Sequence, residues 1–302
     1  MLKLFYKENN DMERVEKIIK QHNECLGVLA ILTYNCNFKC KTCADPLTNK
    51  PDKVNQYLKE KDFEEFICFL SKANNDFGSD KPKFKWVSFT GGEVTTLPFE
   101  YIKEMCDIAH SYGFKTSMFT NGSAKEKLLE LDGDFDQMVI SHHYSDRSVM
   151  PNWVNEFEKT SIIVNKLVDK ISFPTFESFD KFVNEIIEAN VKYRQRFSTY
   201  GYNTPGYKEN HPDWVDIAFT NEETHKGYSK RVIYKGMEFK FTEYSCMISR
   251  TFIQHPNGNV NTTWYNDLAE LDYRGLSKTC LIGDKIDELN EKFKKIVANH
   301  SK

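Results

Sequence analysis

Three cysteines in one short loop constrain this chain more than any other feature. Cys36, Cys40 and Cys43 have the spacing C-x3-C-x2-C, and the apolar run 28–32 comes directly before them. Thiolates at such short spacing are typical ligands of a metal ion or an iron–sulfur cluster. A structural zinc site needs four protein ligands, and the nearest following histidine, His110, is too far along the chain for finger-like spacing. The spacing therefore favours a cluster that is held by three cysteines and keeps one iron open.

The composition is that of an ordinary globular protein and argues against several classes of function. The 302 residues are 40% hydrophobic and 28% charged, which suits one large domain or a large domain with a small one. A net charge of -3 argues against a nucleic-acid partner, because phosphate binding needs a surplus of Lys and Arg. We expect no signal peptide in the charged first 20 residues and no membrane span. With eight cysteines and no leader, we expect a cytoplasmic protein that uses cysteine to bind metal.

Apolar runs alternate with segments of helical periodicity through most of the chain. The expected strands are 27–33, 84–89, 114–119, 137–141, 170–173 and 191–197. The expected helices are 62–73, 99–110, 124–131, a less defined one within 153–168, and 179–190. Regular alternation predicts an α/β fold, with parallel strands joined by right-handed crossovers.

Polar and glycine-rich segments follow the strands where each one ends. They are Gly91-Gly92-Glu93, Thr120-Asn121-Gly122 and the pair Ser141 and His142. Because the carboxyl ends of parallel strands meet at one edge, we expect these segments to lie beside the cysteine loop. Bare glycine backbone allows a ligand to approach closely, and the carboxylate of Glu93 could accept a hydrogen bond from an ammonium group. Plain turns remain the alternative for each segment.

Together these motifs resemble the radical S-adenosylmethionine (radical SAM) enzymes over residues 25–198. The resemblance implies a partial (β/α)6 barrel, a [4Fe-4S] cluster and S-adenosyl-L-methionine as cofactors. It makes Cys36, Cys40 and Cys43 the cluster ligands, with the open iron chelating the methionine part of the cofactor. Inert structural cysteines, or a zinc site, are the alternative for these three residues.

The same resemblance assigns further residues to cofactor binding. They are Gly91, Gly92, Glu93, Thr120, Asn121, Ser141, Arg194 and Phe38. Phe38 is included because Thr42 stands where many relatives have an aromatic residue near the adenine. Arg194 shares a strand face with Arg196, and an arginine there could pair with the carboxylate of the cofactor. A surface position is the alternative for Arg194.

From residue 199 onward the alternation stops. Hairpins are expected at 231–241 and 251–263, and a helix at 284–297. This part faintly resembles the SPASM or twitch extension of radical SAM enzymes, but Cys246 and Cys280 are too few for a four-cysteine auxiliary cluster. We therefore divide the chain into a helical lead-in (1–24), a core barrel (25–198) and a small α+β extension without a complete cluster site (199–302).

The resemblance implies oxidoreductase chemistry, in which S-adenosylmethionine is cleaved reductively and a 5′-deoxyadenosyl radical removes a hydrogen atom from the substrate. His142 and Cys246 are the candidate catalytic residues. A solvated histidine pair, His142 and His143, is the alternative for the first, and buried free cysteine is the commoner case for the second. The expected substrate is a small polar molecule, sugar- or nucleotide-like, or alternatively a ribosomal peptide. A flavodoxin or ferredoxin is the expected reductant. A non-enzymatic protein that binds zinc or an iron–sulfur cluster is the competing class.

Overall fold

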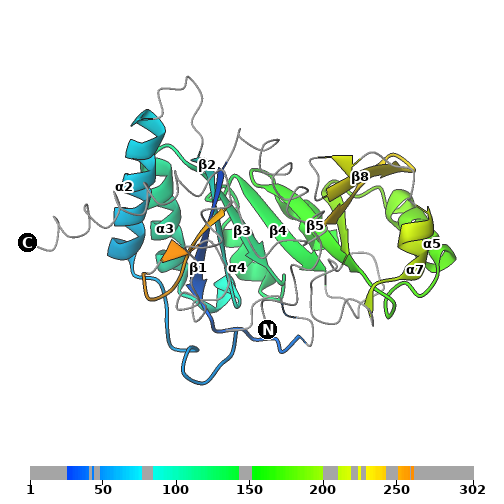
Figure 1. The fold of residues 1–302 in the computed structure, drawn as a ribbon, viewed down its shortest axis with the longest axis horizontal. Coiled ribbons are helices and arrows are strands. Elements are labelled where there is room, and N and C mark those ends of the chain that lie inside the picture. Colours follow the sequence, from blue (N-terminus) through cyan, green and yellow to red (C-terminus); the bar gives the residue numbers. More distant parts are fainter. Residues whose placement is uncertain are drawn as a thin grey trace, which may run out of the picture.

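A curved eight-stranded sheet forms the body of the protein. The computed structural model describes residues 26–40, 43, 48–76, 84–142, 152–199, 210–218, 224–225, 229–242, 251–258 and 260–261 (Figure 1). The strand order is β11-β10-β1-β2-β3-β4-β5-β6, and every neighbouring pair is parallel except β10 and β11. The sheet does not close on itself, so the predicted α/β fold, a partial barrel, is confirmed.

The strands of the main sheet are mostly short, and β1 to β6 alternate with helical segments along the chain. The strands are β1 (Leu26–Thr33), β2 (Phe84–Gly91), β3 (Lys115–Thr120), β4 (Gln137–His142), β5 (Ser161–Val168), β6 (Arg194–Thr199), β10 (Thr251–Gln254) and β11 (Val260–Asn261). The helices are α2 (Glu60–Asp76), α3 (Phe99–Ser111), α4 (Lys125–Glu130), α5 (Phe176–Glu188) and α7 (Asp213–Ala218), with 3-10 turns η2 (Val94–Thr96) and η3 (Asn152–Glu156).

One face of the sheet packs against the helices and holds the main core. Successive side chains of a strand point to opposite faces, so alternate apolar residues of β1 meet α2 and α3. Val28, Ala30 and Leu32 are buried there together with Phe66 of α2 and Ile102 of α3. A second, aromatic cluster surrounds α5 and includes residues of β5 and β6. The opposite face of the sheet carries a small apolar cluster around Ile31 and Ile253, and polar side chains on β4 to β6 that are described with the site below.

The fifth strand differs from the sequence prediction. The segment predicted to contain a helix within 153–168 forms η3 and β5, and the predicted strand 170–173 is a turn. Ser161–Val168 reads SIIVNKLV, and its β-branched residues favour a pleated strand over a helix. The turn is held by Asp169, whose Oδ1 accepts hydrogen bonds from the backbone N–H groups of Ile171 and Ser172 at 2.8 and 2.7 Å.

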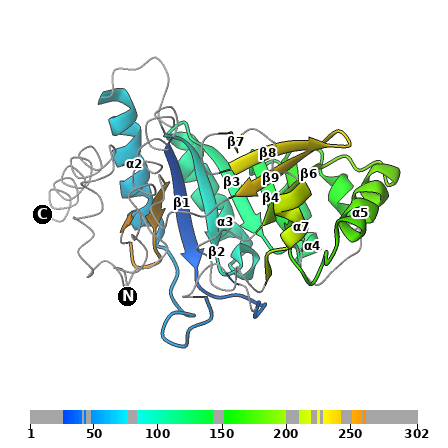
Figure 2. The same cartoon turned by 45° about the vertical axis from the view of Figure 1, so that its right-hand side comes forward.

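The first hairpin of the C-terminal part is confirmed. β8 (Ser229–Tyr234) and β9 (Met237–Thr242) are antiparallel and, with β7 (Thr224–His225), form a separate three-stranded sheet. Figure 2 shows β8 and β9 lying close to β6. At the hairpin turn, the hydroxyl of Tyr234 donates a hydrogen bond of 2.6 Å to Asp180 of α5. The small sheet is therefore fastened to the main body.

The second hairpin, β10 and β11, is also confirmed, but it joins the main sheet. β10 pairs in parallel with β1, with Gly27 opposite Thr251. Just beyond these strands, the hydroxyl of Tyr34 and Nδ1 of His255 share a buried hydrogen bond of 2.7 Å. Two strands from the segment that we assign to the extension thus belong to the main sheet and lie at one end of it. The domain boundaries stay a prediction.

Several predictions fall outside the described residues. They are the helical lead-in at 1–24, Cys246, Cys280 and the helix at 284–297. Among the helices that the structure describes, none has the length and apolar character of a membrane span.

Candidate active site

The cysteine loop and the Gly91-Gly92-Glu93 turn lie side by side at the carboxyl edge of the sheet. The N–H of Gly92 donates to the carbonyl oxygen of Thr33 at 2.8 Å, and the N–H of Glu93 donates to that of Asn35 at 2.8 Å. The backbone that leads into the cysteines therefore runs along the turn after β2. The prediction that these two motifs meet at one edge is confirmed.

The two glycines permit this contact because a side chain at either position would collide with backbone. A Cβ atom on Gly92 would lie 2.1 Å from the carbonyl oxygen of Asn35, and one on Gly91 would lie 2.2 Å from that of Thr33. Gly91 also has a φ of +132°, which side chains rarely allow. The sequence suggested that the glycines make room for a ligand; in the structure, the group that approaches is the chain's own cysteine loop.

Glu93 joins the ends of β2 and β3. Its side chain is 1% exposed, and its carboxylate accepts hydrogen bonds from Thr95 N (3.1 Å), Thr95 Oγ1 (2.7 Å), Thr120 Oγ1 (2.7 Å) and Asn121 N (2.7 Å). A carboxylate offers about four lone-pair sites, so the protein itself uses most of the acceptor capacity. Glu93 is therefore a positioning residue in this structure, and the expected contact with an ammonium group stays a prediction.

Asn121 connects β3 to the cysteine loop. Its Nδ2 donates to Oδ1 of Asn37 at 2.8 Å, and Nδ2 of Asn37 donates to Oγ of Ser123 at 2.7 Å. Asn37 lies directly after Cys36, so these bonds hold the loop between its first two cysteines. Thr120 and Asn121, which we predicted to be cofactor residues, thus have a structural role through their contacts to Glu93 and Asn37.

A residue that the sequence analysis missed holds the base of the loop. Oδ1 of Asn49 accepts from the N–H of Cys36 at 2.9 Å, and Nδ2 of Asn49 donates to the carbonyl oxygen of Phe38 at 2.8 Å. The N–H of Asn49 also donates to the carbonyl oxygen of Tyr34 at 2.9 Å. The sequence carried only a weak signal for this role, since asparagine is common in turns.

Burial and neighbouring groups disfavour the charged forms of two of the three thiols, Cys36 and Cys40. Burial raises the pKa of Cys36, and the nearby Glu93, Cys40 and Cys43 raise it further. Burial and the neighbouring Cys43 likewise raise the pKa of Cys40. A bound cation would reverse this effect by favouring the thiolates.

The donor set fits an iron–sulfur cluster in its chemistry. It consists of thiols from one loop, which are the ligands that such clusters use. In the part of the chain that the structure describes, no group of three or more His, Cys, Asp or Glu side chains forms a preformed cage for a metal ion. The loop would therefore complete its geometry around the metal, as metal-binding loops commonly do.

A row of polar residues crosses the three strands β4, β5 and β6, far from β1 in the strand order. Ser141 of β4, Asn165 of β5 and Arg196 of β6 are neighbours in register. Nε of Arg196 donates to Oδ1 of Asn165 at 2.9 Å, and Ser198 is also within hydrogen-bond distance of Asn165. Arg194 lies on the same face, two residues before Arg196, and is exposed. The face turned away from the helices thus carries a hydroxyl, an amide and a guanidinium group.

The candidate catalytic histidine lies on the opposite face from Ser141. His142 is buried, and its ring packs against Phe182 of α5 with centroids 6.2 Å apart. That position is on the helix-covered side, because successive residues of a strand alternate between faces. A catalytic role for His142 stays a prediction, and this placement gives it no support.

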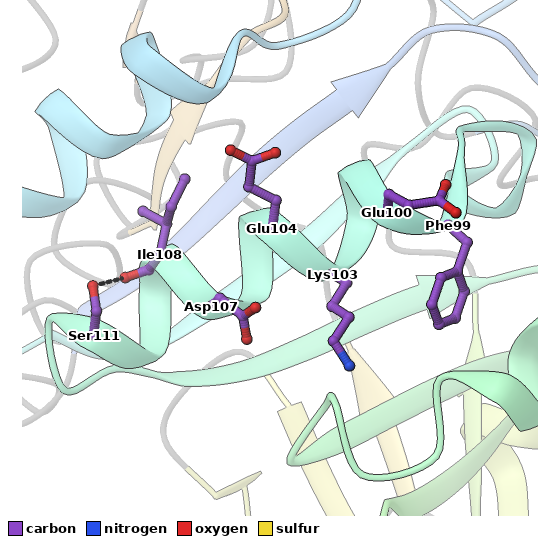
Figure 3. A pocket seen from close by; sticks show the side chains of 7 residues that line it. All are labelled: Phe99, Glu100, Lys103, Glu104, Asp107, Ile108 and Ser111. Atoms are coloured by element: carbon purple, nitrogen blue, oxygen red, sulfur yellow. Dashed lines mark hydrogen bonds between the residues drawn. The ribbon is translucent and has the colours of Figure 1, made fainter.

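A hollow of about 490 Å³ lies away from this edge, on the exposed side of α3 (Figure 3). Its lining residues, all from one helix, are Phe99, Glu100, Lys103, Glu104, Asp107, Ile108 and Ser111. None of them belongs to the motifs at the carboxyl edge. We therefore place the candidate active site at the edge of the sheet and not in this hollow.

Comparisons with known proteins show similarity in fold. No model of a known protein family matches the chain. A solved structure described as native anSMEcpe with bound AdoMet and Cp18Cys peptide has a TM-score of 0.50 at 12% identity, and the match covers 80% of this chain and 74% of that one. The same protein with bound AdoMet alone has a TM-score of 0.49 at 14% identity, over 80% and 75%.

One curated relative is similar in sequence over a shorter stretch. It is an S-adenosylmethionine-dependent nucleotide dehydratase of Thermoplasmatales archaeon (strain ISO4-H5), 28% identical over 108 residues, which are 35% of this chain. The match spans 33% of the relative's own length. The protein thus shares the fold of the AdoMet-bound anSMEcpe structure, with a cysteine loop and a glycine turn joined at the carboxyl edge of its sheet.

Proposed function

We propose that this protein is a radical SAM enzyme whose cluster is held by Cys36, Cys40 and Cys43. One observation carries the proposal: a loop that carries three cysteines lies against the 91–93 turn at the carboxyl edge of a parallel sheet. A structural zinc site takes four protein ligands, and this loop supplies three cysteines. The fold shared with an AdoMet-bound structure supports the same conclusion.

Cys36, Cys40 and Cys43 would hold the cluster, which would supply the electron for reductive cleavage of S-adenosylmethionine and so the radical chemistry that removes a hydrogen atom from a substrate. The protein's own residues bind and orient the reactants. Gly91, Gly92 and Glu93 hold the cysteine loop in place beside the cofactor position. Ser141 and Arg194 are the proposed contacts to the ribose and carboxylate of the cofactor, and Phe38 the proposed contact to its adenine.

We propose a small polar substrate that resembles a nucleotide. The row formed by Ser141, Asn165 and Arg196 offers hydrogen-bond donors and a positive charge, which suit hydroxyl and anionic groups. The similarity to a nucleotide dehydratase supports this class. A peptide is the second candidate, because the anSMEcpe structure of the same fold contains one. A cytoplasmic location and a flavodoxin or ferredoxin as reductant belong to the same proposal.

Anaerobic reconstitution with iron and sulfide tests the proposal. We expect about four irons per chain and dithionite-dependent release of 5′-deoxyadenosine from S-adenosylmethionine. Replacing Cys36, Cys40 or Cys43 by alanine should abolish both, whereas Cys106→Ala, a change in the buried core, should abolish neither. Stoichiometric zinc without cleavage of S-adenosylmethionine would support the non-enzymatic alternative. Deuterated nucleotides or deuterated peptides are then added to the active enzyme. The class whose deuterium appears in 5′-deoxyadenosine is the substrate class.

A further inference from the structure

The side chain of Asn49 binds the cysteine loop through groups that are two residues apart. It accepts from the N–H of Cys36 at 2.9 Å and donates to the carbonyl oxygen of Phe38 at 2.8 Å. Its own N–H donates to the carbonyl oxygen of Tyr34 at 2.9 Å. One residue outside the C-x3-C-x2-C motif therefore sets the backbone path on both sides of the first cysteine.

Asn49 adopts an unusual backbone conformation to make these bonds. Its φ is +58°, in the left-handed region that asparagine enters more readily than most residues. Asn190 has a similar φ of +47° at the end of α5, but its N–H donates to the carbonyl oxygen of Ile187 within that helix end. A left-handed backbone is therefore shared by both asparagines. What distinguishes Asn49 is its hydrogen bonds to the cysteine loop.

The loop is anchored a second time, at Asn37. The bonds from Asn37 to Asn121 and Ser123 tie the residue after Cys36 to the end of β3. Together the two asparagines hold the loop at its base and beyond the first cysteine through amide groups. The first half of the loop therefore has a set shape that does not depend on sulfur–metal bonds.

We infer that Asn49 is a positioning residue for the metal-binding loop, which orders the segment around Cys36 before the metal arrives. This inference rests on the proposed cluster site. A loop that is already ordered loses less conformational entropy when it closes around a metal. Loss of such a supporting residue typically lowers metal affinity about 10- to 100-fold.

Asn49→Gly isolates the side chain, because glycine accepts the left-handed backbone without strain. Asn190→Gly is the matched control, since it makes the same exchange at an exposed left-handed position away from the loop. Asn49→Asp keeps an oxygen for the N–H of Cys36 but loses the donor to Phe38. All proteins are compared in melting temperature without metal, in iron content after reconstitution, and in the rate of iron loss to a chelator.

We expect Asn49→Gly to lose iron at least about 10-fold faster than the wild type and Asn190→Gly, with Asn49→Asp between them. The melting temperatures of the metal-free glycine variants should be similar. Iron content and loss rates equal to those of the wild type would overturn the inference. It would also be overturned if Asn49→Gly unfolded where Asn190→Gly stays folded, because the side chain would then support the whole fold.

A second readout separates this inference from the proposed function. In the metal-free protein, alkylation of Cys36 by iodoacetamide should become several-fold faster in Asn49→Gly, while the buried Cys106 stays unmodified. If the wild type binds no iron, the proposed function fails, but the alkylation rates still report whether Asn49 orders the loop. Unchanged alkylation of Cys36 would then contradict the inference on its own.

Discussion

The side-chain amide of Asn121 donates a hydrogen bond of 2.8 Å to Oδ1 of Asn37, across 84 positions in sequence. This bond joins the end of β3 to the loop that carries the cysteines. Because both groups are exposed, we expect a modest coupling between them, about 0.5–1 kcal/mol. A double-mutant cycle with Asn37→Ala, Asn121→Ala and the combined variant, followed by urea denaturation, measures it. Strictly additive changes in the free energy of unfolding would show that the bond contributes nothing.

Gly92→Ala should move the cysteine loop. The new Cβ would lie 2.1 Å from the carbonyl oxygen of Asn35, so the backbone must shift, at a cost of about 1–3 kcal/mol. Gly113→Ala is the control: Gly113 has a φ of +80° and no atom within 4 Å of the added Cβ, so only about 1 kcal/mol of backbone strain is expected. Iron content after reconstitution should fall for Gly92→Ala only. Equal iron content in the two variants would mean that the tight contact does not control the loop.

Glu93→Gln should destabilise the protein although it preserves the size of the side chain. An amide has one acceptor oxygen, so its NH2 group would face a donor that the carboxylate now satisfies, such as the N–H of Asn121. We expect a loss of about 1–3 kcal/mol in the free energy of unfolding. Glu100→Gln, on the exposed side of α3, should change it by less than about 0.5 kcal/mol. A Glu93→Gln protein as stable as the wild type would contradict the positioning role.

Asp132 should stabilise the folded protein at neutral pH and lose this effect at acid pH. Burial acts to raise the pKa of this carboxyl, but the backbone N–H groups of Glu158, Thr160 and Lys159 outweigh burial and hold the pKa below its usual value. A lowered pKa in the folded state gives stabilisation that is complete above the unfolded pKa of about 3.9 and is lost as the pH falls through the folded value.

Urea denaturation of the wild type and Asp132→Asn at several pH values tests this expectation. The wild type should be the more stable protein near neutral pH, and the difference should shrink as the pH falls below about 4. Asp107→Asn, on the exposed side of α3, provides the comparison for an acidic residue outside such a network. A difference between wild type and Asp132→Asn that is constant from pH 7 to about pH 3 would contradict the proposed origin of the effect.

The fold and the meeting of the motifs could be predicted because both follow from local patterns. Runs such as 28–32 mark buried strands, and the polar turns after parallel strands must share an edge. The fifth strand could not be predicted from periodicity, because Ser161–Val168 contains Asn165 and Lys166 within its apolar pattern. The pairing of β10 with β1 could not be predicted from the sequence of either strand, because parallel strands far apart in sequence meet only through tertiary packing.

The roles of individual side chains were harder to predict than their location. Glu93 was correctly placed at the edge. No sequence motif indicated, however, that its carboxylate would accept hydrogen bonds from Thr95, Thr120 and Asn121. Asn49 escaped notice because its function depends on three backbone groups that only the folded loop brings together. Residues that support a site are generally recognised from such contacts and not from spacing.

The bond between Tyr34 and His255 has a consequence for the order of events during protein synthesis. The two residues are separated by 221 positions, so at typical elongation rates the partner of Tyr34 emerges roughly 10 to 45 s later. Until then β1 has an open edge next to the cysteines. The strand that leads into the cysteine loop therefore stays unpaired along one side until most of the chain has been made.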